Sequence, residues 1–324
     1  MKKPFLAIAA LTLGVSMMTA CSVDTTTNFT SFWNPTPVNE ILPGTLETYE
    51  YEVSLKEKTA SNSTYSLDYK DGTYKTTLSI DPENSELYLL ETTLTLSVAV
   101  QYKEQKTEYF SDSVTTKVKF KSAQNGLRPV YSEKTTVSTS PKALNTSSLA
   151  DAYARYNYTV TTTYNDKCTS ATCERVDFGG EGTGFTAVGN YKKNFSVPQK
   201  HTYLDNEQLV IALRGISSKN EQSLSVYNAS QRKVQTVKSD MDDVQSGSFH
   251  MSLNGEVKDY TIDYAVTSLQ ISGINSGEEQ RYYIAQNVGE SNTFRHMILR
   301  METPLSFNLG TLEYRLIKAT TFNG

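Results

Sequence analysis

The feature that most constrains the fold is an alternation of apolar and polar residues that recurs along most of the chain. Clear examples are the segments 49–55, 94–102, 114–120 and 260–266. An alternation with a period of two places one face of an extended chain against a core and the other in water, which is typical of half-buried β-strands. About fifteen such runs, mostly joined by short turns, predict a mainly β protein with a large curved antiparallel sheet, either a half-barrel or a meander, and one or two helices.

Three dipeptides indicate tight turns between these strands. Asp71-Gly72, Asn125-Gly126 and Asn254-Gly255 have the residue types that two-residue hairpin turns require, because both central positions need a positive φ. We therefore expect Asp71-Gly72 to join a strand at 65–69 to a second strand at 74–80.

One segment near 205–215 breaks the alternation and predicts a helix. Asp205 is placed to cap the first turn, and Gln208 three residues later completes a capping box. Arg214 lies where the negative end of a helix dipole favours a cation, and Gly215 offers a left-handed stop.

The surface of this helix is apolar on every side, from Leu209 to Leu213, so it is expected to be covered by the sheet. A second, short helix is expected within Leu144–Tyr156, where Ser147 or Ser148 is available as a cap. The helix near 205–215 then acts either as a plug in a filled core or as a lid over a ligand.

The N-terminus carries an export signal. Lys2 and Lys3 precede an apolar run from Phe5 to Met18, which is too short to span a bilayer as a permanent anchor. The run ends at Ala20-Cys21, which resembles the lipobox of bacterial lipoproteins. That resemblance implies removal of residues 1–20 and a lipid on Cys21; a plain secretion signal is the alternative.

Residues 21–46 are polar and contain three prolines, so we expect an extended tether before a β domain at 47–324. The lipid would hold the protein to the cell membrane or the outer membrane, facing outside the cytoplasm. Whether the cell has one membrane or two stays open.

The order of elements resembles a family of exported bacterial proteins of unknown function, related in fold to the Lol lipoprotein carriers. The resemblance is carried by a tyrosine-rich opening strand at 48–53, by the helical pattern Asp205, Leu209, Leu213, Arg214, and by a closing strand pair at 300–305 and 310–316. It implies a curved antiparallel sheet with a helix plugging or covering its concave face, and it assigns no catalytic residues.

Cys168 and Cys173 are candidates for a disulfide. They lie five positions apart, and an oxidising compartment outside the cytoplasm favours closure of a small loop between them. Free thiols are the alternative. A metal site is disfavoured because no further cysteine or histidine lies close in sequence.

Other motifs carry no chemistry on inspection. Gly180 to Ala187 has the spacing of a dinucleotide fingerprint but no helix behind it, so a loop is expected, and Ser230-x-x-Lys233 lacks the context of penicillin-interacting enzymes. The three histidines are scattered, and the acidic run 240–243 lacks the pattern of a calcium loop. No cofactor or metal is predicted. The net charge of −4, or −6 without Lys2 and Lys3, argues against nucleic-acid partners.

Two classes of function remain. The first is a non-enzymatic lipoprotein that binds an apolar ligand or a lipid on the concave face of its sheet. The second is a structural or protein-interaction lipoprotein of the cell envelope, whose sheet is filled by its own side chains. A hydrolase is a third hypothesis, because paired carboxylates leave little trace in one sequence.

Overall fold

The structure is a computed structural model of the 324-residue chain. It describes residues 44–57, 65–123, 126–142, 146–199, 202–215, 222–229, 232–271, 279–286, 294, 296–305 and 309–321. The predicted signal segment, Cys21 and the tether up to residue 43 lie outside these residues. Within them, no helix is long and apolar enough to cross a membrane.

The described residues are mainly β, as predicted. The strands are Thr45–Glu57 (β1), Tyr65–Ile80 (β2), Tyr88–Tyr102 (β3), Gln105–Lys106 (β4), Phe110–Ala123 (β5), Gly126–Pro141 (β6), Tyr153–Tyr164 (β7), Ser170–Asp177 (β8), Tyr191–Ser196 (β9), Thr202–Asp205 (β10), Gln222–Asn228 (β11), Lys233–Met241 (β12), Gln245–Leu253 (β13), Glu256–Ile271 (β14), Gln280–Ala285 (β15), Ile298–Pro304 (β16) and Thr311–Thr321 (β17). The helices are Leu149–Ala152 (α1), Asn206–Gln208 (η1), Leu209–Ala212 (α2) and Leu213–Gly215 (η2).

Strand β1 is the centre of one antiparallel sheet with two arms. In the first arm β1 pairs with β2, and the ladder continues through β3, β5, β6, β7 and β8 to β9. In the second arm β1 pairs with β17, followed by β16, β15, β14, β12 and β11, with β10 parallel to β11 at the end. The predicted meander is therefore confirmed, with the closing strand brought back beside the opening one.

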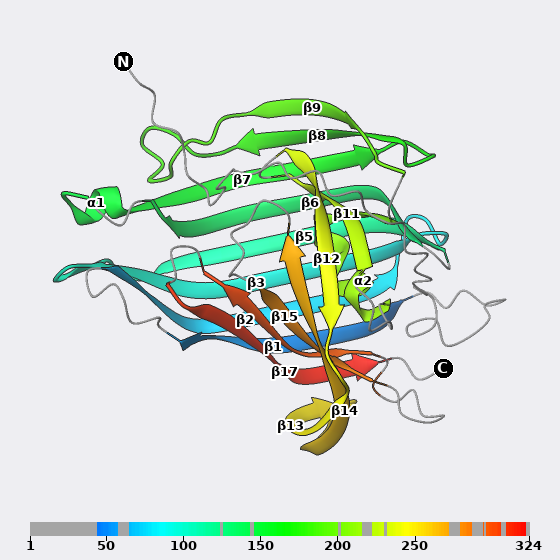
Figure 1. Ribbon diagram of the computed structural model, residues 1–324. Helices are drawn as coiled ribbons and strands as arrows, with labels where there is room; N and C mark the ends of the chain where they lie inside the picture. Colours follow the sequence, from blue (N-terminus) through cyan, green and yellow to red (C-terminus); the bar gives the residue numbers. More distant parts are fainter. Residues whose placement is uncertain are drawn as a thin grey trace.

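The second arm also closes on itself. Strand β13 pairs with β14 on one side and, over two residues, with β17 on the other, so that β13 to β17 form a ring. Figure 1 shows β11, β12 and α2 lying across the broad sheet formed by β1 to β9. The second arm thus folds back over the concave face of the first.

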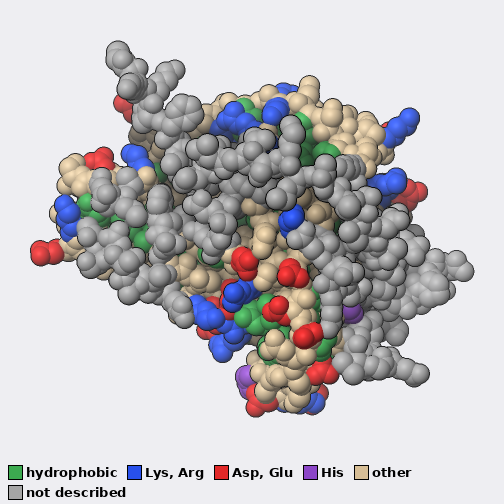
Figure 2. All heavy atoms as spheres, viewed as in Figure 1, with side chains coloured by type: hydrophobic (Ala, Val, Ile, Leu, Met, Phe, Trp, Pro, Cys, Tyr) green, Lys and Arg blue, Asp and Glu red, His purple; other side chains and the backbone are tan. Residues whose placement is uncertain are grey.

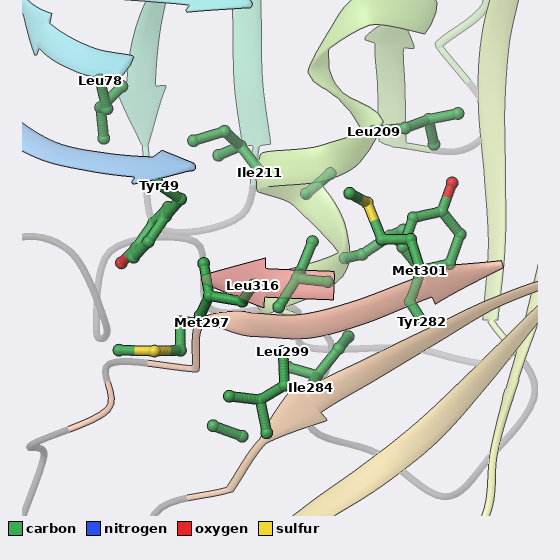
Figure 3. Close-up of a cluster of buried hydrophobic side chains, with 14 of the residues drawn as sticks. Tyr49, Leu78, Leu209, Ile211, Tyr282, Ile284, Met297, Leu299, Met301 and Leu316 are labelled. Carbon is green, nitrogen blue, oxygen red and sulfur yellow. The ribbon is translucent and has the colours of Figure 1, made fainter. Parts of the chain in front are cut away.

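The helical segment at 206–215 lies inside this double layer. Leu209, Ile211 and Leu213 are buried and pack against side chains of both arms, among them Tyr49 of β1. Figure 3 shows Ile211 on the side of Tyr49 and Leu78, and Leu209 on the side of Tyr282 and Met301, with Leu316 below the helix. The helix is therefore a buried plug between the two arms, which is one of the two roles expected from its apolar surface.

One of the three predicted turns is confirmed in full. Asn254 and Gly255 have φ values of 51° and 90° and join β13 to β14. Strands β5 and β6 pair as expected, but Gly126 is the first residue of β6, opposite Ala123, and Asn125 lies outside the described residues. The prediction for Asp71-Gly72 was wrong, because these residues form a bulge within the single strand β2. A Cβ on Gly72 would lie 2.3 Å from the carbonyl oxygen of Val53, so the glycine allows β1 to pass closely.

The second helix is shorter than predicted. Ser148 caps α1 by accepting a hydrogen bond from the Asp151 amide, but the helix ends at Ala152. From Tyr153 onward the chain pairs with β6, because main-chain hydrogen bonds to a neighbouring strand outweigh a weak local helical preference.

Candidate functional site

A half-open cavity of about 260 Å³ lies beside the first turn of the helical segment. The same strands that build the core also build its walls. Tyr282 precedes Ile284 on β15 and Met301 follows Leu299 on β16, on faces that continue into the buried cluster. The lining residues are Tyr74, Thr92, Lys134, Asn206, Glu207, Leu209, Val210, Ile271, Gln280, Tyr282, Met301, Thr303 and Tyr314.

One wall of the cavity is aromatic and aliphatic. The rings of Tyr74 and Tyr314 lie edge to face with their centroids 5.5 Å apart. Burial raises the pKa of Tyr314 to about 12, so its hydroxyl is uncharged at neutral pH. Leu209 and Met301 complete this wall, and Figure 3 shows both of them close to Tyr282.

The opposite wall is polar and carries one ion pair. The Lys134 Nζ of β6 lies 3.0 Å from Oε1 of Glu207, and the side-chain amide of Asn206 donates to the same oxygen at 3.0 Å. Burial lowers the pKa of Lys134, but the neighbouring carboxylate of Glu207 raises it more, so the pKa of the lysine is raised overall. The cavity therefore has an apolar side and a charged but neutralised side.

The predicted capping box holds this polar wall in place. The Asp205 carboxylate accepts from the Glu207 amide at 3.2 Å, and the Asp205 amide donates to the Gln208 side chain at 3.0 Å. The same carboxylate accepts from the hydroxyls of Ser132 and Tyr164, at 2.7 and 2.6 Å. Because Asp205 is fixed by three elements, Asn206 and Glu207 have a defined position at the cavity.

Arg214 lies at the last helical turn, as predicted, but its partner was not foreseen. The side chain is buried and forms a two-pronged ion pair with Glu47 of β1, whose second oxygen also accepts from Tyr49 at 2.8 Å. The Arg214 Nε donates to the main-chain oxygen of His296 at 3.1 Å. The ion pair joins the helix to the central strand β1, and the hydrogen bond to His296 joins it to the chain before β16. Gly215 is the last residue of η2, and the chain that follows it lies outside the described residues.

The disulfide prediction was wrong, because Cys168 and Cys173 are both free and buried. Cys168 lies in the β7–β8 turn, whereas Cys173 is the fourth residue of β8. The Cys173 Sγ lies 3.4 Å from the Tyr191 hydroxyl instead.

The glycine-rich stretch that resembles a dinucleotide fingerprint is a loop, as expected. Gly180, Gly182 and Gly184 have positive φ, and strand β9 follows the loop at Tyr191. In the part of the chain that the structure describes, no three histidine, cysteine or acidic side chains are grouped as a metal site requires. Ser230 and His201 lie outside those residues.

Sequence reasoning placed the aromatic wall but missed the polar one. Tyr74, Tyr282 and Tyr314 belong to alternating runs, so their inward direction follows from the pattern. The inner face of β6 instead reads Ser132, Lys134 and Thr136, and a polar face against a cavity looks the same in sequence as a polar face in water. The capping box was the available signal, because it fixed where Glu207 would lie.

Comparisons with known proteins give a likeness at the level of the fold. No family model matches the chain, and no curated protein matches it in sequence. A crystal structure of a β-barrel-like protein of the domain of unknown function DUF1849, from Brucella abortus, is similar to it with 8% identity and a TM-score of 0.46, over 87% of this chain and 100% of that one. The expected relation to the Lol carriers and the lipoprotein anchor stay predictions.

Proposed function

We propose that this chain is a non-enzymatic, lipid-anchored binding protein that holds the apolar end of an amphipathic ligand in the cavity beside the helix. The observation that supports the proposal is the two-sided cavity itself. An aromatic and aliphatic wall meets the Lys134–Glu207 pair and Asn206. An apolar wall with a few placed polar groups is the usual composition of small-molecule sites.

The size of the cavity limits the ligand. An apolar cavity of about 150 Å³ takes up benzene, so 260 Å³ accommodates roughly ten non-hydrogen atoms. A long acyl chain would therefore fill the cavity with one end and leave the remainder outside. The sequence predicted a lipid on the concave face; the proposal is that the cavity holds only the end of an acyl chain.

A chain-length series of fatty acids tests this proposal. The delipidated protein should bind a fluorescent fatty-acid probe, and unlabelled fatty acids should displace that probe. Their affinity should rise with chain length up to the number of carbons that the cavity holds and change little beyond it. Thr303→Phe places a ring in the cavity and should weaken binding about tenfold or more, equivalent to 1.4 kcal/mol. Thr303→Val keeps the volume and is the matched control.

The variant Lys134→Met tests the polar wall, with Lys117→Met as the control because Lys117 pairs with Glu91 on the outer surface. Loss of affinity in Lys134→Met alone supports a polar end of the ligand at this ion pair. Equal affinity in Thr303→Phe and Thr303→Val, or no fatty-acid binding at all, would reject the cavity as the site.

A structural or interaction role is the second candidate, and the β13–β14 hairpin favours it. The hairpin projects from the body in Figure 1. Val257 near its tip is 63% exposed, and Val244, just before β13, is 51% exposed. Exposed apolar side chains of this kind suit a protein contact. Recovery of one envelope protein by the native chain, and its loss with Val257→Ser, would support this role.

A further inference from the structure

A second site is built around Tyr191 on the outermost strand of the first arm. The guanidinium of Arg175 on β8 lies 4.7 Å from the centre of the Tyr191 ring, and that of Arg232, before β12, lies 4.1 Å from it. The Tyr191 hydroxyl donates to the main-chain oxygen of Ala229 at 2.9 Å, which fixes the ring between the two arms of the sheet. Two arginines are thus held over one aromatic ring.

Arg175 is fixed from behind by the glycine-rich loop. Its Nε donates to the carbonyl oxygen of Gly189 at 2.9 Å, and a terminal nitrogen donates to that of Val188 at 2.5 Å. The side chain is 7% exposed. The loop itself is held by Asp177, which accepts main-chain hydrogen bonds from Val188 and Gly189. The loop that resembles a dinucleotide fingerprint therefore serves to position an arginine.

The two arginines lack a carboxylate partner among the described residues. Asp177 is close enough to act on Arg175 electrostatically, but its oxygens are directed at the loop amides. Burial, followed by the like charge of Arg232, lowers the pKa of Arg175. Two neighbouring guanidinium groups without an ion pair repel one another, so an anion between them would relieve the repulsion.

Further cations surround this pair. The Lys193 Nζ donates to the main-chain oxygen of Arg232 at 2.6 Å, Lys233 follows Arg232 directly, and Lys192 is balanced by Glu174 at 3.1 Å. Figure 2 shows Lys and Arg side chains gathered over the top of the molecule, where Figure 1 places β8 and β9. This local excess of positive charge stands out in a chain whose net charge is negative.

We propose that Arg175, Tyr191 and Arg232, with Lys193 at their edge, form a binding site for a phosphate group. Guanidinium groups donate paired hydrogen bonds to phosphate oxygens, and the lysine adds a point charge. The phosphate has two chemical sources, a soluble phosphate and the headgroup of an anionic phospholipid. The site is separate from the cavity beside the helix, and the proposal does not depend on a ligand there.

The test uses the full chain with Cys21→Ser, so that no lipid is attached. The first experiment follows binding of inorganic phosphate by ³¹P NMR. The second experiment measures, at low ionic strength, how much protein sediments with phosphatidylcholine vesicles that contain or lack phosphatidylglycerol. The N-terminal segment carries Lys2 and Lys3 and would itself favour anionic vesicles, so only the change that each substitution causes relative to the Cys21→Ser chain is read. Arg232→Gln and Lys193→Gln should each lower the anionic-vesicle partition about fivefold.

Arg315→Gln is the matched control, because Arg315 is an exposed arginine of β17 that pairs with Glu52. The site is supported if phosphate or the anionic vesicles bind, and if Arg232→Gln weakens that binding while Arg315→Gln does not. The experiment in which binding is seen identifies the source of phosphate. Binding in neither experiment, or equal loss in Arg232→Gln and Arg315→Gln, overturns the proposed site. Thr303→Phe should leave binding unchanged in both experiments, so this result can be distinguished from success or failure of the cavity proposal.

Discussion

The guanidinium of Arg214 on η2 donates to both carboxylate oxygens of Glu47 on β1, and the two side chains are 3% and 2% exposed. The ion pair joins residues 167 positions apart and connects the helical plug to the central strand of the sheet. Breaking a buried pair costs far more than the pair contributes relative to apolar residues, because the remaining charge has no partner.

Glu47→Gln should therefore lower the free energy of unfolding by about 3–5 kcal/mol, measured by urea denaturation. Glu52→Gln removes an exposed partner of Arg315 and should change it by less than about 1 kcal/mol. The double variant Glu47→Gln/Arg214→Met should recover part of the loss. Similar stabilities for Glu47→Gln and Glu52→Gln would show that the buried pair does not hold the plug.

Aspartate in the middle of the plug should unfold the core. Leu213 is fully buried, and Leu213→Asp would place an unpaired carboxylate among aliphatic side chains, so we expect a loss above about 4 kcal/mol. Leu209→Asp should cost less, because Leu209 also borders the cavity and its carboxylate could reach water. Val257→Asp is the exposed control, and thermal unfolding ranks the three. Equal effects at Leu213 and Val257 would contradict the buried position of the helix.

Stability should fall in mild acid through His296. Burial, followed by the charge of Arg214, lowers the pKa of His296 below its ordinary 6.5. The unfolded chain therefore binds the proton more readily, and stability is lost as the pH falls from about 6.5 toward the folded-state value. His296→Gln should flatten this part of the curve of unfolding free energy against pH. An unchanged slope in the variant would assign the loss to other groups.

The two buried cysteines should remain thiols. Burial raises the pKa of Cys168, which slows its reaction further. In the Cys21→Ser chain, non-reducing mass spectrometry should find both thiols, and a maleimide should label them slowly in the native protein and rapidly in urea. A mass lower by two hydrogens in the native protein would instead show that Cys168 and Cys173 form a disulfide.

The sequence by itself determined the secondary structure and the direction of most side chains. Alternation at 49–55 and 260–266 predicted strands with a buried face, and the capping box of Asp205 and Gln208 is present with the predicted hydrogen bonds. These features depend on residues that are neighbours along the chain, so their physical causes are local. The error at Asp71-Gly72 arose because this bulge, like a hairpin turn, needs a residue that tolerates positive φ, and Asp71 has a φ of 53°.

Only the tertiary structure decided which of these elements meet. The pairing of β1 with β17 and the contact of Arg214 with Glu47 join distant parts of the chain, and no local pattern specifies such partners. The same holds for the cavity, whose polar wall comes from β6 and η1 and whose aromatic wall comes from β2, β15 and β17. Long-range packing brought these residues together because the apolar helix had to be buried between the two arms of the sheet.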